Sequence, residues 1–422
     1  MDKICVTGGK QLVGSVTISG AKNAALPLMV ASLLTKGITT LNNVPNLKDV
    51  HTLTHLLETI GAKVEIQKNK LIIDTQGELT PVAPYEIVKK MRASIYVLGP
   101  LLARFQAAKV SLPGGCAWGP RPVDLHIKAM EALGATVDVE EGYIRAEGEL
   151  VGKRFKFDLV SVGATGNALM AAVLAKGMTI LENVAIEPEI TNLVDMLIAM
   201  GAKIDGRETR TLTITGVEEL HPVEFDVIPD RIEAGTYMAA AAMTAGELVL
   251  KNVDPHQLSS VIRKMEEAGV ISEPGDRTLF VKGPKKLTAV DVRTEVYPGF
   301  PTDMQAQWMA MMTIADGTSV IEDTIYHDRF SHAAEMVRLN ASISIHNNCA
   351  TVHGKTSLKA APVMSTDLRA SASLILCGLV AEGRTEVSRV YHLDRGYEKI
   401  EKKFEECGAD IVRVHEQMEF DV

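Results

Sequence analysis

One cysteine, Cys116, lies in a segment rich in glycine and proline, and its surroundings suit a reactive thiol. The segment reads Pro113-Gly-Gly-Cys116-Ala-Trp-Gly-Pro-Arg121-Pro122, which puts the thiol five residues before an arginine. A nearby cation lowers the pKa of a thiol, and the thiolate is the reactive form. Glycine and proline also suit a loop that closes over a site as a lid. The alternative is an incidental or buried thiol in a surface turn.

Positively charged residues stand where helices are expected to begin. The positive end of a helix dipole disfavours a cation at that position unless an anion is also bound. Helix N-termini and cations together suit the binding of phosphate groups, so these positions predict an anion site; the alternative is a set of solvated surface charges. Apolar helical segments begin at or near Lys22, Arg92 and Arg369. More polar helical segments begin at or near Arg121, Arg329 and Arg395.

The overall charge and composition restrict the partners. Lys and Arg total 44 and Asp and Glu total 53, so the net charge is −9; this disfavours nucleic acid but allows a small anionic substrate. The longest apolar run, residues 168–175, is far shorter than the roughly 20 residues that span a bilayer, and no export signal is recognised. The five cysteines form no Cys-x-x-Cys pair, which predicts reduced thiols in the cytoplasm and no metal site. No cofactor is expected, and the oligomeric state is left open.

The elements that must position these residues form an internal repeat of about 70 residues. Each copy reads as an apolar helix, a strand, a second helix, a turn and a strand hairpin. The turn contains Gly-Ala or a near equivalent, where a left-handed residue would close the second helix. The six turns start at Gly61, Gly134, Gly201, Gly269, Asn340 and Gly408.

The first helix of a copy is apolar nearly all round, as in residues 168–175, 237–243 and 373–380. A helix without a polar face belongs in a core, whereas the second helices carry one apolar stripe and the hairpins alternate. The prediction is therefore an α/β protein, a two-domain inside-out barrel with helices buried and sheets outside. We expect one domain over residues 22–229, carrying the Cys116 loop, and another over 1–21 and 230–422, with the active site in the cleft between them.

Six motifs, in order along essentially the whole chain, resemble the enolpyruvyl transferase family, and within it the members that act on UDP-N-acetylglucosamine. The family's inside-out α/β fold agrees with the repeat. The motifs are Gly20-Ala-Lys22-Asn23, the Cys116 loop continuing into Arg121-Pro-Val-Asp-Leu125, Ser161-Val-Gly163, Pro229-Asp230-Arg231-Ile-Glu-Ala-Gly, Pro301-Thr-Asp303 and Asp394-Arg395-Gly-Tyr397.

The resemblance implies transfer of the enolpyruvyl group of phosphoenolpyruvate to the 3′-hydroxyl of UDP-N-acetylglucosamine, the first committed step of peptidoglycan synthesis. Such an addition and elimination needs both an acid and a base. Cys116 matches the family's cysteine, which supplies acid function, can form a thioether with phosphoenolpyruvate and is alkylated by fosfomycin. Asp303 matches the carboxylate that accepts the hydroxyl proton; a helix cap is the alternative reading.

The resemblance also implies two sets of substrate contacts. Lys22, Asn23, Arg121 and Arg395 match residues around phosphoenolpyruvate, and Lys22 and Arg395 count among the catalytic residues. Residues matching contacts to UDP-N-acetylglucosamine are Arg92, Arg121, Pro122, Val123, Asp124, Leu125, Ser161, Val162, Gly163, Asp303 and Ile325. A further set of positions matches family residues with less defined roles in closure or catalysis. These positions are Glu187, Asp230, Arg231, Arg329, Asp367 and Arg369.

Two positions depart from the pattern of many relatives. Leu159 stands where they carry a lysine, which puts a lysine contact to the nucleotide in doubt, and His327-Asp328-Arg329-Phe330 replaces their Glu-Asn-Arg-Phe. Two other functions are open. One is the sister reaction on shikimate 3-phosphate, whose enzyme lacks the cysteine loop; the other is a non-catalytic paralogue that senses a UDP-sugar, in which Cys116, Asp303 or Lys22 would be lost.

Overall fold

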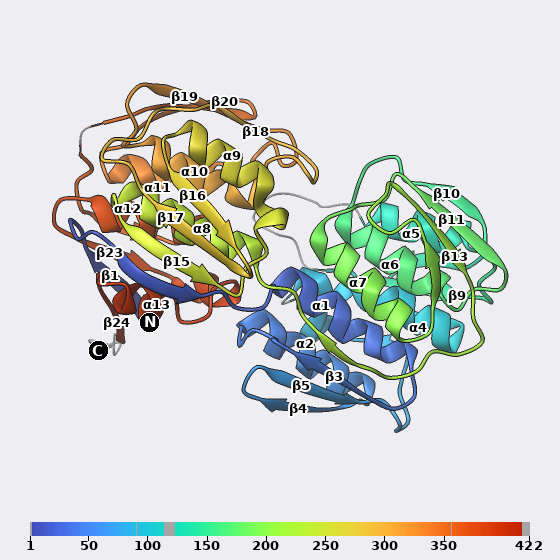
Figure 1. The fold of residues 1–422 in the computed structure, drawn as a ribbon. Coiled ribbons are helices and arrows are strands. Elements are labelled where there is room, and N and C mark those ends of the chain that lie inside the picture. Colours follow the sequence, from blue (N-terminus) through green and yellow to red (C-terminus); the bar gives the residue numbers. More distant parts are fainter. Residues whose placement is uncertain (1, 90, 114–122, 356, 416–422) are drawn as a thin grey trace. The chain divides into compact units, whose positions relative to one another are not determined.

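A computed structural model describes residues 2–89, 91–113, 123–355 and 357–415 (Figure 1). The chain divides into two compact units. The first unit is Gly20–Ile228, and the second unit consists of Met1–Ser19 and Pro229–Val422. Each unit has its own apolar core.

Each unit contains three four-stranded sheets of one design. In the sheet β14-β3-β5-β4, the short edge strand β14 (Glu224–Asp226) runs parallel to β3 (Ile38–Asn42). Strand β3 pairs antiparallel with β5 (Lys70–Asp74), which forms a hairpin with β4 (Lys63–Gln67). Along β5, Leu71 and Ile73 are buried while Lys70, Ile72 and Asp74 are partly exposed, so one sheet face is wet, as the alternation predicts.

The other five sheets repeat this design, with the parallel edge pair named first. In the first unit, the second sheet consists, in order, of β6 (Val82–Ala83), β7 (Ala107–Ser111), β9 (Tyr143–Glu147) and β8 (Thr136–Glu140). The third sheet of this unit consists of β10 (Arg154–Lys156), β11 (Met178–Glu182), β13 (Thr211–Thr215) and β12 (Lys203–Asp205). In the second unit, one sheet consists, in order, of β2 (Val13–Thr17), β15 (Glu247–Lys251), β17 (Thr278–Lys282) and β16 (Ile271–Gly275). Another consists of β18 (Val292–Thr294), β19 (Thr318–Asp323), β21 (Cys349–His353) and β20 (Ser342–His346). The last consists of β22 (Pro362–Met364), β23 (Arg384–Ser388), β1 (Asp2–Thr7) and β24 (Asp410–His415). The hairpins predicted from the repeat are present in five sheets. In the sixth, the prediction was wrong: β24 pairs with β1 from the other end of the chain. The repeat did not predict the short parallel strands.

The apolar helices lie inside the units, which confirms the predicted inside-out fold class. Every residue of α8 from Ile232 to Met243 is buried, and so is every residue of α12 from Ala370 to Leu379. In the second unit α8 (Arg231–Met243), α10 (Gln305–Met312) and α12 (Ala370–Val380) pack together; the first unit buries α1 (Lys22–Ala31), α4 (Leu98–Phe105) and α6 (Val162–Ala172). The sheets cover these helices, as Figure 1 shows for each unit.

The second helix of each repeat is half-exposed and ends where predicted. The φ angles of the six turn residues are 116°, 98°, 107°, 94°, 70° and 92° for Gly61, Gly134, Gly201, Gly269, Asn340 and Gly408. All six lie in the left-handed region, which glycine and asparagine tolerate best. The helices are α2 (Lys48–Ile60), α5 (Asp124–Ala132), α7 (Pro188–Ala199), α9 (Ser259–Glu267), α11 (Ser331–Arg338) and α13 (Ile400–Glu406); shorter helices are α3 (Tyr85–Val88), η1 (Ser32–Leu34), η2 (Arg92–Val97), η3 (Pro255–Leu258), η4 (Thr302–Met304) and η5 (Val390–Arg395).

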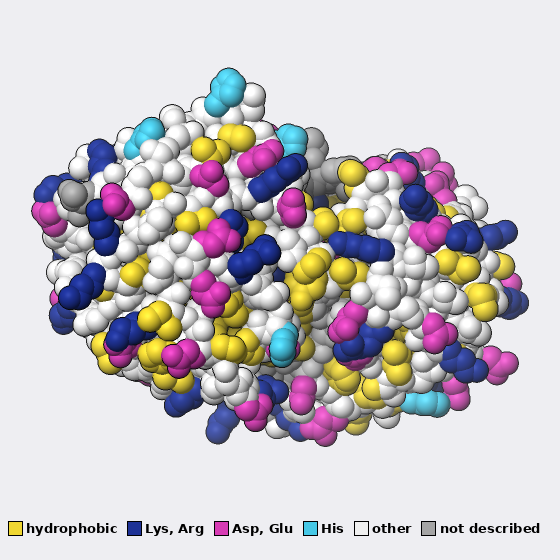
Figure 2. All heavy atoms as spheres, turned by 45° about the horizontal axis from the view of Figure 1, so that its top comes forward, with side chains coloured by type: hydrophobic (Ala, Val, Ile, Leu, Met, Phe, Trp, Pro, Cys, Tyr) yellow, Lys and Arg dark blue, Asp and Glu magenta, His cyan; other side chains and the backbone are white. Residues whose placement is uncertain are grey.

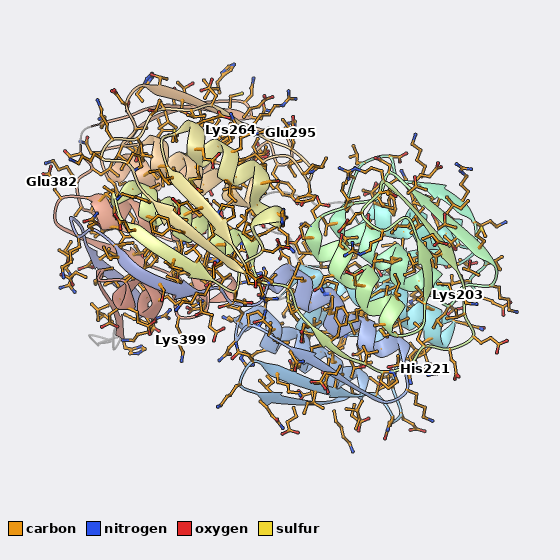
Figure 3. All side chains as sticks on the ribbon, viewed as in Figure 1. Lys203, His221, Lys264, Glu295, Glu382 and Lys399 are labelled. Carbon is orange, nitrogen blue, oxygen red and sulfur yellow. The ribbon has the colours of Figure 1, made fainter. Side chains whose placement is uncertain are left out.

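The surface carries charges of both signs. On the face in Figure 2, basic and acidic side chains are interspersed, and Lys203, Glu382 and Lys399 project outward (Figure 3). Among the helices of the described ranges, none combines the length and apolar character needed to cross a membrane.

Candidate active site

The second unit holds the Asp303 carboxylate between two arginines. Arg329 Nη1 lies 2.8 Å from Asp303 Oδ1 and 3.1 Å from Thr302 Oγ1, and Arg369 Nε lies 3.9 Å from Asp303 Oδ2. The Asp303 side chain is 28% exposed, whereas those of Arg329 and Arg369 are 11% and 4% exposed. Asp303 is therefore a partly exposed carboxylate flanked by two guanidinium groups.

Burial and neighbouring acids act in opposite directions on the two arginines. Burial alone would lower the pKa of Arg329, but Asp303, Asp367 and Asp323 raise it above its ordinary value. For Arg369, burial is likewise outweighed by Asp230, which raises its pKa. Both guanidinium groups therefore stay charged and keep a positive field around Asp303.

Asp323, at the end of β19, links the Asp303 turn to the segment that carries Ile325. Its Oδ2 accepts a hydrogen bond from Thr302 Oγ1 at 2.8 Å, and its Oδ1 accepts one from the Ile325 backbone N–H at 3.0 Å. Thr294 Oγ1 donates to the same Oδ1 at 2.8 Å, and Asp323 is fully buried. The structure thus joins two of the predicted site segments through a residue that the motifs did not single out. In the sequence, the only feature that could have pointed to Asp323 is its place as an acidic residue at the end of an apolar strand.

Asp230, Asp367 and Arg369 join the starts of α8 and α12. Asp230 Oδ1 accepts from the N–H groups of Ile232 and Glu233, and Asp367 Oδ1 accepts from those of Arg369 and Ala370. Asp230 is the N-cap of α8, and Asp367 binds the backbone of the two residues where α12 begins. Arg369 Nη2 then lies 3.1 Å from Asp230 Oδ2, and both side chains are at most 5% exposed.

The segment of Arg395 is attached to the same group. Arg369 Nη1 donates to the carbonyl of Gly396 at 3.3 Å, next to Arg395, which ends η5. Arg231, the first residue of α8, instead lies over the ring of Tyr297, 5.5 Å from its centroid. The second unit therefore brings the Asp303, Ile325 and Arg395 segments together around two buried arginines.

In the first unit, Lys22 has an acidic partner at the start of the next helix. Lys22 opens α1, and its Nζ lies 3.2 Å from Oδ2 of Asp49, the second residue of α2. The two side chains are 12% and 5% exposed. A cation at this helix start thus has a carboxylate beside it, a pairing that the sequence pattern does not reveal. Asn23 follows as the second residue of α1.

The start of α6 forms a second group in the first unit. Ser161 is its N-cap, and its Oγ accepts from Ala164 N–H at 3.2 Å. Gly163 lies against the ring of His126 on α5: a methyl group at this glycine would stand 3.3 Å from the His126 Nε2. Arg92 is close enough to lower the pKa of His126, so the Arg92 and Ser161–Gly163 segments share this region with the start of α5. That helix begins at Asp124 and Leu125, directly after Val123.

Three of the predicted site residues, Cys116, Arg121 and Pro122, lie outside the described residues. Leu159, at the position where many relatives carry lysine, is 70% exposed. Among the residues that the structure describes, no group of three His, Cys, Asp or Glu side chains could hold a metal ion.

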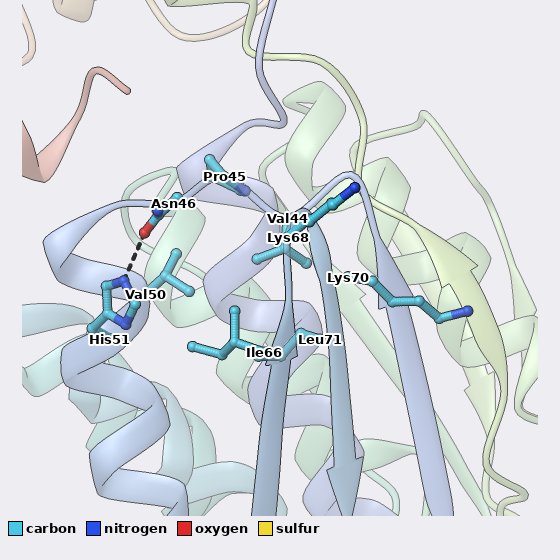
Figure 4. Close-up of a pocket in the computed structure, with 9 residues that line it drawn as sticks. All are labelled: Val44, Pro45, Asn46, Val50, His51, Ile66, Lys68, Lys70 and Leu71. Atoms are coloured by element: carbon cyan, nitrogen blue, oxygen red, sulfur yellow. Dashed lines mark hydrogen bonds between the residues drawn. The ribbon is translucent and has the colours of Figure 1, made fainter. Parts of the chain in front are cut away.

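Two surface hollows lie away from these groups. The one in Figure 4, in the first unit, has a volume of about 10 Å³, and His51 Nε2 lies 2.7 Å from Asn46 Oδ1 at its rim. That volume suits roughly one water molecule. A larger open hollow of about 420 Å³ in the second unit includes Lys264 and Glu295 (Figure 3), and its charges are mixed. Neither hollow is lined by a predicted site residue.

Comparisons with known proteins agree over nearly the whole chain. The family model described as EPSP synthase (3-phosphoshikimate 1-carboxyvinyltransferase) matches residues 6–404. A UDP-N-acetylglucosamine 1-carboxyvinyltransferase of Pelodictyon phaeoclathratiforme is 55% identical over 417 residues, covering 98% of both chains. One of Geobacter metallireducens is 53% identical over 417 residues, covering 99% of this chain and all of the relative.

Solved structures show the same fold at lower identity. The enolpyruvyl transferase NikO from Streptomyces tendae superposes with a TM-score of 0.89 at 24% identity, over 98% of both chains. An EPSP synthase from Acinetobacter baumannii superposes with a TM-score of 0.77 at 18% identity, over 98% of this chain and all of the other.

Proposed function

This chain belongs to the enolpyruvyl transferase family of EPSP synthase, and on that premise we propose that it is a UDP-N-acetylglucosamine 1-carboxyvinyltransferase. It transfers the enolpyruvyl group of phosphoenolpyruvate to the 3′-hydroxyl of UDP-N-acetylglucosamine and releases phosphate. The observation that carries this proposal is the identity of 53–55% with full-length relatives of that name. The product is a precursor of peptidoglycan.

In the proposed mechanism, Asp303 accepts the proton of the sugar 3′-hydroxyl as its oxygen attacks C2 of the enol. Cys116 supplies a proton to C3, which gives a tetrahedral intermediate. The Cys116 thiolate then takes a proton back from C3, the C2–O bond to phosphate breaks to restore the double bond, and the leaving phosphate takes up the proton held by Asp303. Lys22, Arg121 and Arg395 neutralise the phosphate and carboxylate of phosphoenolpyruvate, with Asn23 as a polar contact.

Arg329 and Arg369 support this role of Asp303. Both side chains lie beside the carboxylate and hold it in place for the substrate hydroxyl. Arg329 Nη1 bonds to one carboxylate oxygen, Oδ1, and Arg369 Nε lies 3.9 Å from the other, Oδ2.

The UDP-sugar is proposed to contact Arg92, Val123 to Leu125, Ser161 to Gly163 and Ile325, with Arg121 and Pro122 of the Cys116 loop. The start of α6 suits its diphosphate, because helix N-terminal N–H groups bind anions. We place the reaction in the cytoplasm; the described cysteines Cys5, Cys349, Cys377 and Cys407 are free thiols, which suits a reducing compartment.

The sister reaction is the competing function within the family. Identity to the two UDP-N-acetylglucosamine enzymes is 53–55%, whereas identity to the EPSP synthase structure is 18%. The presence of Cys116, Asp303 and Lys22 argues against a non-catalytic sensor.

The test is release of inorganic phosphate from phosphoenolpyruvate, measured with UDP-N-acetylglucosamine and, in parallel, with shikimate 3-phosphate. We expect phosphate only with the nucleotide sugar, together with a product heavier by the enolpyruvyl group in mass spectrometry. Phosphate release only with shikimate 3-phosphate would transfer the assignment to the sister reaction. Binding of the nucleotide sugar without any release would make the chain a sensor.

A further inference from the structure

Arg413, which none of the motifs includes, lies on the last strand, β24, beside β1 (Figure 1). Its guanidinium binds the carboxylate of Asp394, the residue directly before Arg395: Nη2 lies 2.6 Å from Oδ1, and Nη1 lies 3.1 Å from Oδ2. We propose that Arg413 is a positioning residue that, through Asp394, holds Arg395 in place for phosphoenolpyruvate. The inference rests on the proposed function, in which Arg395 binds this substrate.

Two further carboxylates of the second unit fix the Arg413 guanidinium. Its Nε lies 3.1 Å from Oε1 of Glu401 on α13, and its Nη1 lies 3.4 Å from Oδ2 of Asp2 on β1. The hydrogen bonds to Asp394 raise the pKa of Arg413 most, burial acts against this shift, and Glu401 raises the pKa further, so the group stays charged. Contacts to β1 and α13 therefore set the point from which Arg413 binds Asp394.

Two hydrogen bonds between the same pair of planar groups determine direction as well as distance. A guanidinium and a carboxylate joined in this way have a defined mutual orientation, so the Asp394 side chain cannot turn independently of Arg413. A lysine would supply the same charge, but its ammonium group is a compact point charge without the planar fork. The substitution Arg413→Lys therefore separates the effect of orientation from the effect of charge.

The chain directly after Arg395 is anchored as well. The carbonyl of Gly396 accepts a hydrogen bond from Arg369 Nη1 at 3.3 Å. The next residue, Tyr397, is buried, and its hydroxyl lies 2.8 Å from Thr236 Oγ1 in α8. Arg395 therefore stands between neighbours that are bound to the rest of the second unit on both sides.

The segment depends on such anchors because its own backbone supplies little rigidity. The 3₁₀-helix η5 is only six residues long, and its hydrogen bonds have poorer geometry than those of an α-helix. Arg389 before it and Lys399 after the segment have φ angles of 56° and 46°, in the left-handed region that residues with side chains seldom adopt. Such conformations persist where surrounding contacts impose them, and the bonds from Arg413 are contacts of this kind.

The placement of Arg395 should matter more for phosphoenolpyruvate than for the nucleotide sugar. In the proposed function Arg395 faces the phosphate and carboxylate of phosphoenolpyruvate, and charge-assisted hydrogen bonds to these groups depend on geometry. A displacement of about 1 Å at such a group can cost as much as about 100-fold in rate. A merely structural role of Arg413 would instead lower the stability and leave the KM values of both substrates alone.

The first experiment compares the full-length wild type with Arg413→Lys in steady-state phosphate release. We expect the KM of phosphoenolpyruvate to rise about tenfold and that of UDP-N-acetylglucosamine to stay within about twofold. Arg207→Lys is the control, because Arg207 binds Asp195 of the first unit through two bonds of 2.6 and 2.8 Å; both its KM values should match the wild type. A folded Arg413→Lys protein with an unchanged KM of phosphoenolpyruvate, or with equal rises in both values, would overturn the proposal.

A second variant, Asp394→Asn, tests the route through Asp394. The amide keeps one oxygen acceptor but cannot accept two hydrogen bonds from Arg413 as the carboxylate does. We expect a similar rise in the KM of phosphoenolpyruvate, and a double variant no worse than the more impaired single one, because the pair acts as a unit. Additive effects would show that Arg413 does not act through Asp394. Should Arg413→Lys fail to fold, the KM values of Asp394→Asn decide the proposal in the same way.

A third measurement needs no turnover. The Kd of phosphoenolpyruvate, measured by titration calorimetry without the nucleotide sugar, should rise about tenfold in Arg413→Lys and stay unchanged in Arg207→Lys. If the wild type shows this difference but releases no phosphate with UDP-N-acetylglucosamine, only the proposed function falls. Equal Kd values in the wild type and Arg413→Lys would overturn the inference itself. A wild type that neither binds phosphoenolpyruvate nor releases phosphate from it would overturn both.

Discussion

Asp303 is an acidic residue that the structure surrounds with positive charge. Its Oδ1 is bonded to Arg329, and Arg369 lies on its other side. Replacing it with asparagine keeps the shape and an acceptor for Arg329 but removes the base. We expect kcat to fall roughly 100- to 10,000-fold, while the KM of UDP-N-acetylglucosamine changes little. Steady-state kinetics test this, with Asp328→Asn on the adjacent exposed loop as the control. Turnover near the wild-type rate would remove Asp303 from the mechanism and leave only a structural role.

Cys116 can be tested although it lies outside the described residues. Cys116→Ser should lose turnover by about 100-fold or more, because a hydroxyl of much higher pKa is a poor proton donor to carbon at neutral pH. Fosfomycin should no longer inactivate or label the protein. Cys349→Ser, at a half-exposed thiol of β21, should behave like the wild type. Inactivation by fosfomycin with an unlabelled Cys116, seen by peptide mass spectrometry, would place the reactive thiol elsewhere.

At the scale of elements, a buried ion pair joins the starts of α8 and α12. Arg369→Met would leave Asp230 buried without its partner, which costs about 3–5 kcal/mol of unfolding free energy. Adding Asp230→Asn should recover part of this loss, since the amide oxygen can still cap α8 and no bare charge remains. Urea denaturation of the wild type, both single variants and the double variant measures the coupling. Additive effects of the two substitutions would show that the pair contributes no joint stabilisation.

The turns that end the second helices differ in the room that they leave for a side chain. At Gly61, φ is 116° and an added Cβ would lie 2.4 Å from the carbonyl oxygen of Glu78; at Gly134, φ is 98° and the nearest atom is 3.7 Å away. Gly134→Ala should therefore cost only the left-handed strain, about 1–2 kcal/mol. Gly61→Ala should cost more, because the backbone must also move. Both lie in the first unit, so urea denaturation compares them directly, and equal losses would contradict the steric argument.

At the scale of the whole molecule, the repeat made most of the fold predictable. Apolar helices, striped helices and six turn residues follow from local sequence, because each depends on periodicity or on one left-handed position. The three-residue edge strands such as β14 could not be predicted, since they are too short to show alternation. The pairing of β1 with β23 and β24 joins the two ends of the chain, a contact that no local pattern encodes.

The candidate site was predictable to a smaller degree. Motifs pointed to Asp303, Lys22 and Ser161, whose surroundings the structure now describes. They did not point to Asp323, because this side chain fixes its neighbours through hydrogen bonds between separate segments of the chain. Asp49 was missed for the same reason: its pairing with Lys22 depends on how α1 packs against α2.

The stability of the second unit should depend on pH through His332, on α11. This histidine is fully buried, and in the described part of the chain neither ring nitrogen has a hydrogen-bond partner. Burial lowers its pKa from 6.5 to about 4, with Asp367 acting against this shift and Arg329 adding to it. Because the folded state binds the proton less readily than the unfolded state, the stabilisation is complete above pH 6.5 and is lost as the pH falls towards 4. Between these values one proton contributes a slope of about 1.4 kcal/mol per pH unit.

His332→Met removes this group while keeping a side chain of similar volume. At pH 7 we expect the variant to be as stable as the wild type or more so, since an unpaired buried polar group is replaced by an apolar one. Between pH 6.5 and 4 its unfolding free energy should fall less steeply, by the slope of one proton. Urea denaturation at half-unit pH steps measures both effects. Parallel pH profiles for the two proteins would mean that His332 takes up its proton in the folded state, and that Asp367, close to the ring, outweighs burial.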